Sequence, residues 1–178
     1  MKSIRLICQI AISSLWATLT LAALPVGTSP APVSLSGDLG GRLDGKPWSS
    51  DELKGKVMVV LYVDPDEKAI NEKVEDALKA EKFPYDRYGS VAVINMAASW
   101  IPNKFIASAL EEKQKKFPNT IYVKDLKRSL VKSWQLKDDS YCIVAFDKDG
   151  KVIFSKDGKF ADEDTKSLIE AIRKSLSA

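Results

Sequence analysis

Val57-Met-Val-Val-Leu-Tyr-Val63 is an unbroken apolar run, rich in β-branched residues, in the first half of the chain. Because apolar and polar residues do not alternate, the run predicts a strand buried on both faces, as in a parallel sheet. Apolar residues recur at helical spacing among charges over 67–82, which predicts an amphipathic helix. A second apolar run, Val91–Met96, predicts the next buried strand. Strand, helix and strand in this order predict a βαβ unit with a right-handed crossover.

The rest of the chain extends this pattern in both directions. Glycines over 37–50 suit turns around a short N-terminal hairpin. Downstream, the spacing predicts helices and strands in alternation: a helix over 103–116 capped by Asn103, a strand at 120–123, a helix over 126–136, strands at 141–146 and 152–155, and a helix over 162–176. Asp147–Gly150 predicts the turn between the last two strands. We therefore predict an α/β fold with a central mixed sheet flanked by helices.

The first 36 residues predict export rather than a folded core. Lys2 and Arg5 precede an apolar stretch, Leu6–Ala23, which is typical of a signal peptide cleaved near Ala22-Ala23. An uncleaved membrane anchor is the alternative, because the stretch is long enough to span a bilayer. We expect a signal peptide at 1–23, a linker at 24–36 and one domain at 37–178, located in the periplasm with no membrane span after cleavage.

Composition excludes several classes of function. The net charge is +3, and removal of Lys2 and Arg5 leaves +1, so no basic excess indicates nucleic-acid binding. The sequence has no histidine, which removes the usual general base and the usual zinc ligand. We expect no cofactor and no metal. Cys142 is the only cysteine besides Cys8 in the leader.

Two phrases of the sequence resemble the exported thioredoxin-like proteins of the TlpA, ResA and peroxiredoxin-like group. One is the entry to the first central strand, 44–57, and the other is the late hairpin, 146–153. The order of elements over 37–176 is similar as well. The resemblance implies a thioredoxin-like fold.

Four shorter pieces resemble the YtfJ family, small periplasmic proteins of Gram-negative bacteria without a settled function. They are Phe83–Tyr88, Val93–Asn95, Trp134–Leu136 and Lys156–Gly158. The chain is accordingly identified as a member of that family, a thioredoxin-like protein in which the Cys-x-x-Cys pair is missing.

The resemblance also implies where a redox site would lie. Thioredoxin chemistry needs two cysteines after the first central strand, where a helix N-terminus stabilises the attacking thiolate. The matching stretch, Asp64–Ala69, contains neither cysteine. The proline that faces the pair in thioredoxins falls at about Tyr141, so it is absent too. We expect no dithiol-disulfide exchange.

Several residues remain as candidates for function. Asp64, Asp66 and Glu67 follow a central strand, at the edge where open α/β sheets bind ligands. They could bind a hard cation or only favour a helix N-terminus. Tyr141 faces the same edge by the resemblance. Cys142 is a weak catalytic candidate, since a cysteine in an apolar strand more often packs as a small hydrophobe.

Asp86, Arg87 and Tyr88 form a second candidate group, which could bind a partner or tie a loop to the sheet. The main hypothesis for function is a redox-inactive periplasmic protein that binds a protein or peptide partner, and we lean against an enzyme. The alternatives are a thiol or peroxide enzyme using Cys142, and a protein that binds a small ligand or metal. Trp48, Trp100 and Trp134 cannot be assigned to core or surface from the sequence.

Overall fold

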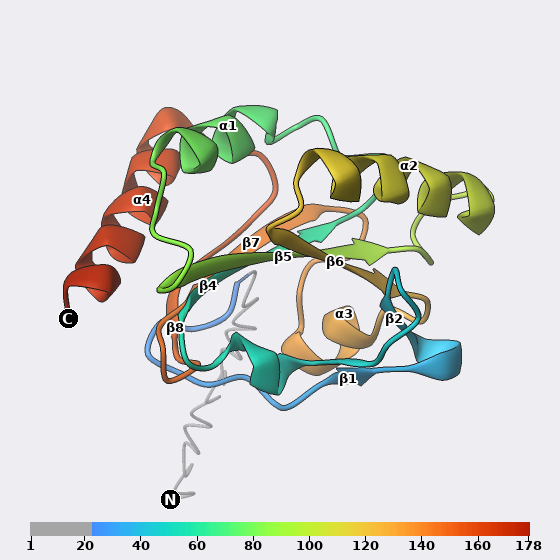
Figure 1. The fold of residues 1–178 in the computed structure, drawn as a ribbon, viewed down its shortest axis with the longest axis horizontal. Helices are drawn as coiled ribbons and strands as arrows, with labels where there is room; N and C mark the ends of the chain where they lie inside the picture. Colours follow the sequence, from blue (N-terminus) through green and yellow to red (C-terminus); the bar gives the residue numbers. More distant parts are fainter. Residues whose placement is uncertain (1–22) are drawn as a thin grey trace, which may run out of the picture.

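The computed structural model describes residues 23–178, and its main sheet has six strands in the order β2-β6-β5-β4-β7-β8 (Figure 1). Their bounds are β2 (Gly40–Arg42), β6 (Thr120–Asp125), β5 (Tyr88–Asn95), β4 (Val57–Val63), β7 (Tyr141–Phe146) and β8 (Val152–Asp157). The three central strands β4, β5 and β6 run parallel, and the other three run antiparallel to their neighbours. The predicted mixed sheet is confirmed.

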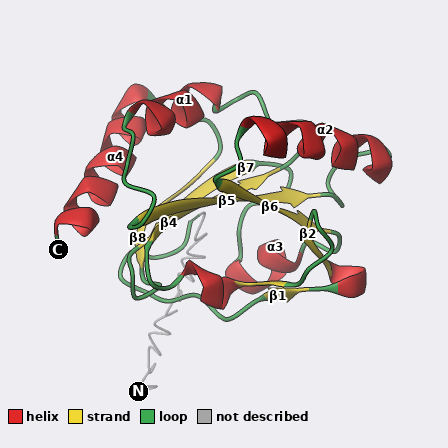
Figure 2. Cartoon of the chain, in the orientation of Figure 1, coloured by secondary structure: helices red, strands yellow, loops and turns green. Residues whose placement is uncertain are grey.

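Helices cover both faces of this sheet. Figure 2 shows α1 (Glu72–Ala80), α2 (Asn103–Lys116) and α4 (Asp162–Ser177) over one face. The short helix α3 (Ser129–Trp134) and the N-terminal segment lie on the other face. The predicted α/β class, with a central sheet between helices, is therefore the observed architecture.

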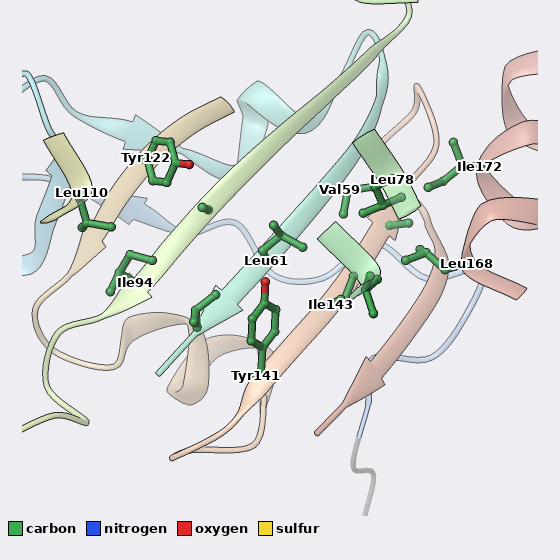
Figure 3. Close-up of a cluster of buried hydrophobic side chains, with 14 of the residues drawn as sticks. Val59, Leu61, Leu78, Ile94, Leu110, Tyr122, Tyr141, Ile143, Leu168 and Ile172 are labelled. Carbon is green, nitrogen blue, oxygen red and sulfur yellow. The ribbon is translucent and has the colours of Figure 1, made fainter. Parts of the chain in front are cut away.

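Each face of the sheet builds its own apolar core, because successive side chains of a strand point to opposite faces. On β4, Val59 and Leu61 pack with the residues of α1, α2 and α4, as Figure 3 shows for this cluster. Val60 and Tyr62 face the other way, into a cluster with Trp48 and Trp134. All seven residues of β4 are buried, which is why its sequence has no alternation.

The N-terminal antiparallel pair is present, but its strands are not consecutive. β1 (Ser34–Leu35) pairs with β3 (Trp48–Ser49), while β2 between them joins the main sheet beside β6. Gly40 permits this crossing: its φ is 124°, and a Cβ atom there would lie 1.9 Å from the Lys124 carbonyl oxygen. No side chain fits so close a backbone approach.

Residues 24–36, expected as a linker, are part of the folded domain. Val152 exchanges backbone hydrogen bonds with Gly27 and Thr28 at the edge of β8. Leu35 is fully buried and Val33 is 6 % exposed, so the segment contributes to the second core. These apolar residues are spaced too irregularly for the sequence to reveal their role. The predicted signal peptide lies outside the described residues, apart from Ala23.

Some element boundaries agree with the prediction and others differ: β5 begins at Tyr88 rather than at Val91, and α3 spans Ser129–Trp134 rather than 126–136. Helix α2 and strand β7 begin and end at the predicted residues. Asn103 is the first residue of α2 rather than its N-cap, which is Pro102. Helix α1 begins at Glu72, not at residue 67. Asn71 is held by the loop after β8: its Nδ2 donates to the Gly158 carbonyl and its Oδ1 accepts from the Phe160 amide.

Candidate functional site

The carboxyl ends of β4, β5 and β6 lie at one edge of the sheet, here called the carboxyl edge. Asp64, Asp66 and Glu67 come directly after β4 and sit in a turn, not at a helix N-terminus, because α1 begins later than predicted. The Asp64 Oδ1 accepts from the Asp66 amide at 2.9 Å. The Glu67 amide bonds to the Asp64 carbonyl. The Asp64 side chain therefore stabilises the turn. The helix-dipole interpretation is wrong for all three residues, because α1 begins at Glu72.

Asp64 is the buried member of this group. It is 4 % exposed, whereas Asp66 is exposed and Glu67 half-buried. Burial raises the pKa of the Asp64 carboxyl above its usual value, and the negative charges of Asp66, Asp139 and Glu67 raise it further. Residues 23–178 contain no cluster of three or more His, Cys, Asp or Glu side chains able to hold a metal ion.

Tyr141 begins β7 and lies opposite Val63, the last residue of β4. The Asp64 amide donates to the Ser140 carbonyl at 3.0 Å, so the loop before Tyr141 is joined to the loop after β4. Tyr141 itself is 1 % exposed and points into the helix-side core (Figure 3). Its hydroxyl donates to Glu75 Oε1 at 2.7 Å. Burial, more than Glu75, raises the pKa of Tyr141. A partner at the surface could not contact this side chain directly.

Sequence reasoning missed a polar cluster at the same edge, centred on Arg128. Its Nη1 lies 2.9 Å from Asp138 Oδ2, and its Nη2 donates to the Ala97 carbonyl at 2.9 Å. Asn95 donates to the other oxygen of Asp138, also at 2.9 Å. Arg128 therefore joins three loops: those after β5, after β6 and before β7. Its φ of 57° is left-handed, an uncommon conformation for arginine that the surrounding contacts must hold.

Exposed apolar side chains gather on the carboxyl edge. Trp100, in the loop after β5, is 86 % exposed, and Phe105, in the first turn of α2, is 59 % exposed. The Leu39 side chain is exposed as well. The Leu39 carbonyl accepts a hydrogen bond from the amide of Leu126, which follows β6, so Leu39 lies at the same edge. The Ser99 hydroxyl donates to Asp66 Oδ1 at 3.1 Å, which links the Trp100 loop to the loop after β4. Three of the five large exposed apolar residues within 23–178 thus share this edge.

The second predicted group lies at the opposite edge. Tyr88 begins β5 and pairs with Val57, the first residue of β4. Since each residue of a strand advances about 3.3 Å, Asp86 and Arg87 are roughly 20 Å from Asp64. Asp86 and Arg87 are exposed and form no ion pair with each other. Tyr88 is half-buried and packs on the Phe83 ring, with centroids 4.9 Å apart. The two groups of candidates do not form one site.

Cys142 is fully buried in β7, on the face that carries α3. Burial raises the pKa of its thiol, and the neighbouring Asp157 carboxylate raises it further. Reactive cysteines have a lowered pKa and some exposure. The weak catalytic candidate therefore has neither property.

Comparison with known proteins assigns the chain to a family. Residues 35–175 match the family described as "Bacterial protein of unknown function (YtfJ_HI0045)". The chain belongs to the YtfJ family. It is 32 % identical to the uncharacterised protein YtfJ of Escherichia coli K12 over 135 residues, 74 % of this chain and 73 % of that protein. An uncharacterised protein of Haemophilus influenzae is 30 % identical over 130 residues, 71 % of each chain.

Solved structures similar to this YtfJ-family chain have thioredoxin-like folds. A thiol-disulfide isomerase from Corynebacterium glutamicum superposes with a TM-score of 0.60 at 18 % identity, covering 84 % of this chain and 97 % of that one. At this identity the likeness concerns the fold alone. Within the described residues, no helix has the length and apolar character needed to cross a bilayer.

Proposed function

We propose that this YtfJ-family protein is exported to the periplasm and binds a protein or peptide partner at its carboxyl edge without redox chemistry. The family and its relatives are uncharacterised, so the argument depends on the side chains at this edge. The stretch after β4, where the thioredoxin resemblance expects two cysteines, has none. A dithiol mechanism has no second sulfur to resolve a mixed disulfide.

The observation that carries the proposal is Trp100, 86 % exposed on a loop that is held by hydrogen bonds in the residues just before it. Ser99 bonds to Asp66, and Ala97 accepts from Arg128. A tryptophan exposed to water contributes no folding energy, and tryptophan is enriched among the residues that dominate binding energies. A loop held in place loses little conformational entropy when a partner binds. Both properties favour a docking surface.

The test is a pull-down from periplasmic extract with the wild-type domain and two variants. Trp100→Ala removes the exposed aromatic ring of the carboxyl edge. Tyr85→Ala is the matched control, because Tyr85 is 68 % exposed but lies in the loop before β5, at the other edge. We expect a protein captured by wild type and Tyr85→Ala and lost with Trp100→Ala. Equal capture by all three proteins would contradict a docking role for this edge.

The absence of redox activity is tested separately. In an insulin-reduction assay with dithiothreitol, the domain should reduce insulin no faster than the reductant alone, because no cysteine pair is available. Insulin reduction faster than that background would contradict the redox-inactive part of the proposal. It would not bear on the docking surface, which the pull-down tests.

A further inference from the structure

At the amino edge of the parallel strands, three loops meet the end of α4 around a pocket of about 260 Å³. The loop before β4 contributes Lys56, the loop before β5 contributes Asp86 and Arg87, and the β7–β8 turn contributes Lys148. Ser175, Leu176 and Ala178, from α4 and beyond, line the remaining side. The pocket lies at the opposite end of the sheet from Trp100, so it is independent of the docking surface proposed above.

The backbone around this pocket is fixed by hydrogen bonds between the loops. The Gly55 amide donates to the Lys148 carbonyl at 2.8 Å, and the Val57 amide donates to the Arg87 carbonyl at 2.9 Å. The Lys56 ammonium donates to the Tyr85 carbonyl at 2.6 Å. The backbones of the three cationic residues are therefore placed around the pocket by the fold, and the Lys56 side chain is held as well.

Arg87 differs from the other arginines between residues 23 and 178. Arg42, Arg128 and Arg173 each form an ion pair with a carboxylate of the protein. Arg87 forms none, and Lys56 and Lys148 have no carboxylate partner among the described residues either. The guanidinium group offers a planar fork of N–H donors that matches the oxygens of phosphate or carboxylate.

The charges around the pocket indicate which anion it favours. The side chains that line the pocket carry three positive charges and one negative charge, that of Asp86, so two positive charges remain in excess. A phosphate monoester carries about −1.5 to −2 charges at pH 7 and three acceptor oxygens. The pocket lining offers such a group the guanidinium of Arg87, the ammonium of Lys148 and the hydroxyl of Ser175.

From this arrangement we infer that the amino-edge pocket binds a phosphate group, either free phosphate or a phosphate monoester. Arg87 binds it through two N–H donors, and Lys56 and Lys148 supply charge. The inference places Asp86 and Arg87 in a binding site, although these two residues form no ion pair with each other. Tyr88, the third residue of the predicted group, only packs against the sheet.

Isothermal titration calorimetry tests the inference with inorganic phosphate and with phenyl phosphate, each at ionic strength held constant with chloride. We expect saturable binding to wild type. Arg87→Gln should weaken binding by about tenfold or more, because a lost charge-assisted contact costs at least about 1.4 kcal/mol. The affinity of Arg87→Lys for phosphate should lie between those of wild type and Arg87→Gln, because lysine keeps the positive charge but lacks the forked pair of N–H donors.

Lys132→Gln is the matched control, because it removes an exposed cation from α3, away from the pocket. It should bind phosphate as wild type does. Saturation by phenyl phosphate alone would identify a monoester as the ligand, and saturation by inorganic phosphate alone would identify the free ion. The inference is overturned if neither compound binds, or if Arg87→Gln with an unchanged melting temperature binds as tightly as Lys132→Gln.

Discussion

At the scale of single residues, burial determines what Cys142 and the acidic side chains can do. Cys142 is a catalytic candidate only because it is the one cysteine within residues 23–178. Its neighbour across the β7–β8 pair is Asp157, and both carboxylate oxygens of Asp157 are buried with no hydrogen-bond partner among residues 23–178. The pair therefore has the burial of a core contact and lacks the exposure that an active-site thiol needs.

The buried thiol should react slowly with a soluble disulfide reagent. The raised pKa keeps Cys142 protonated near neutral pH, and only the thiolate is nucleophilic. We expect almost no reaction in buffer at pH 7–8 and full reaction in denaturant, monitored by the absorbance of the released thiol. Fast native labelling, at the rate of an unfolded control, would revive the enzyme hypothesis.

Asp157 should make stability depend on pH. Burial raises its folded-state pKa above the unfolded value, so the folded state binds protons more tightly. The contribution of Asp157 to stability is therefore greatest below about pH 3.8, and it is lost as pH rises through the raised pKa. Asp157→Asn should remove this loss and be more stable than wild type at pH 7.5, with a smaller difference at pH 4.

Urea unfolding at both pH values measures this difference. Asp149→Asn is a suitable control, since Asp149 is exposed in the β7–β8 turn. A variant Asp157→Asn that is less stable than wild type at pH 7.5 would mean that the carboxylate is stabilised by its surroundings after all.

At the scale of elements, Asp125 explains how the chain turns from β6 into α3. The side chain is fully buried and accepts from the Ser129 and Leu130 amides, and from Lys127 and the Tyr62 hydroxyl as well. It thereby satisfies amides at the start of a helix that is too short to be stable alone. This turn in turn sets the position of Arg128, the centre of the polar cluster.

Asp125→Ala should therefore destabilise the protein by about 2–4 kcal/mol, because several buried donors lose a charged acceptor together. The change is measured as the free energy of unfolding in urea. Asp76→Ala, an exposed position on α1, should change stability by less than about 0.5 kcal/mol. A loss at Asp125 no larger than the control's would show that water replaces the carboxylate.

At the scale of the whole molecule, the N-terminal segment is the main addition to the predicted domain. Leu24 donates its amide to Ser155 Oγ, and Trp134 donates its indole N–H to the Ala31 carbonyl. Together with Val33 and Leu35, these contacts cover the face of the sheet opposite α1, α2 and α4. Without the segment, Trp134 and its neighbours would be exposed to water.

Leu35→Ala should cost about 2–5 kcal/mol of unfolding free energy, the range for a leucine truncated in a close-packed core. Leu39→Ala provides a control with the same change in chemistry, because Leu39 is 44 % exposed and lies only four residues away. Thermal or urea unfolding distinguishes the two. Similar small losses for both variants would support the original interpretation of residues 24–36 as a linker.

Local sequence determined those elements whose conformation follows from consecutive residues alone. The unbroken run of β4, the apolar spacing of α2 and the Asp-Gly turn after β7 each specify one structure, because burial and backbone conformation are written into consecutive residues. The family and the absence of a cysteine pair also followed from the sequence. No tertiary contact was needed for any of these conclusions.

The tertiary structure decided everything that depends on residues distant along the chain. Asn71 delays the start of α1 because it bonds to residues 87 and 89 positions away. Contacts between distant residues also determine the exposure of Trp100 and the burial of Tyr141, and they place the two candidate groups at opposite edges of the sheet. Side-chain spacing reports which face of an element is apolar, but only the packed fold determines which polar groups meet and which remain exposed to a partner.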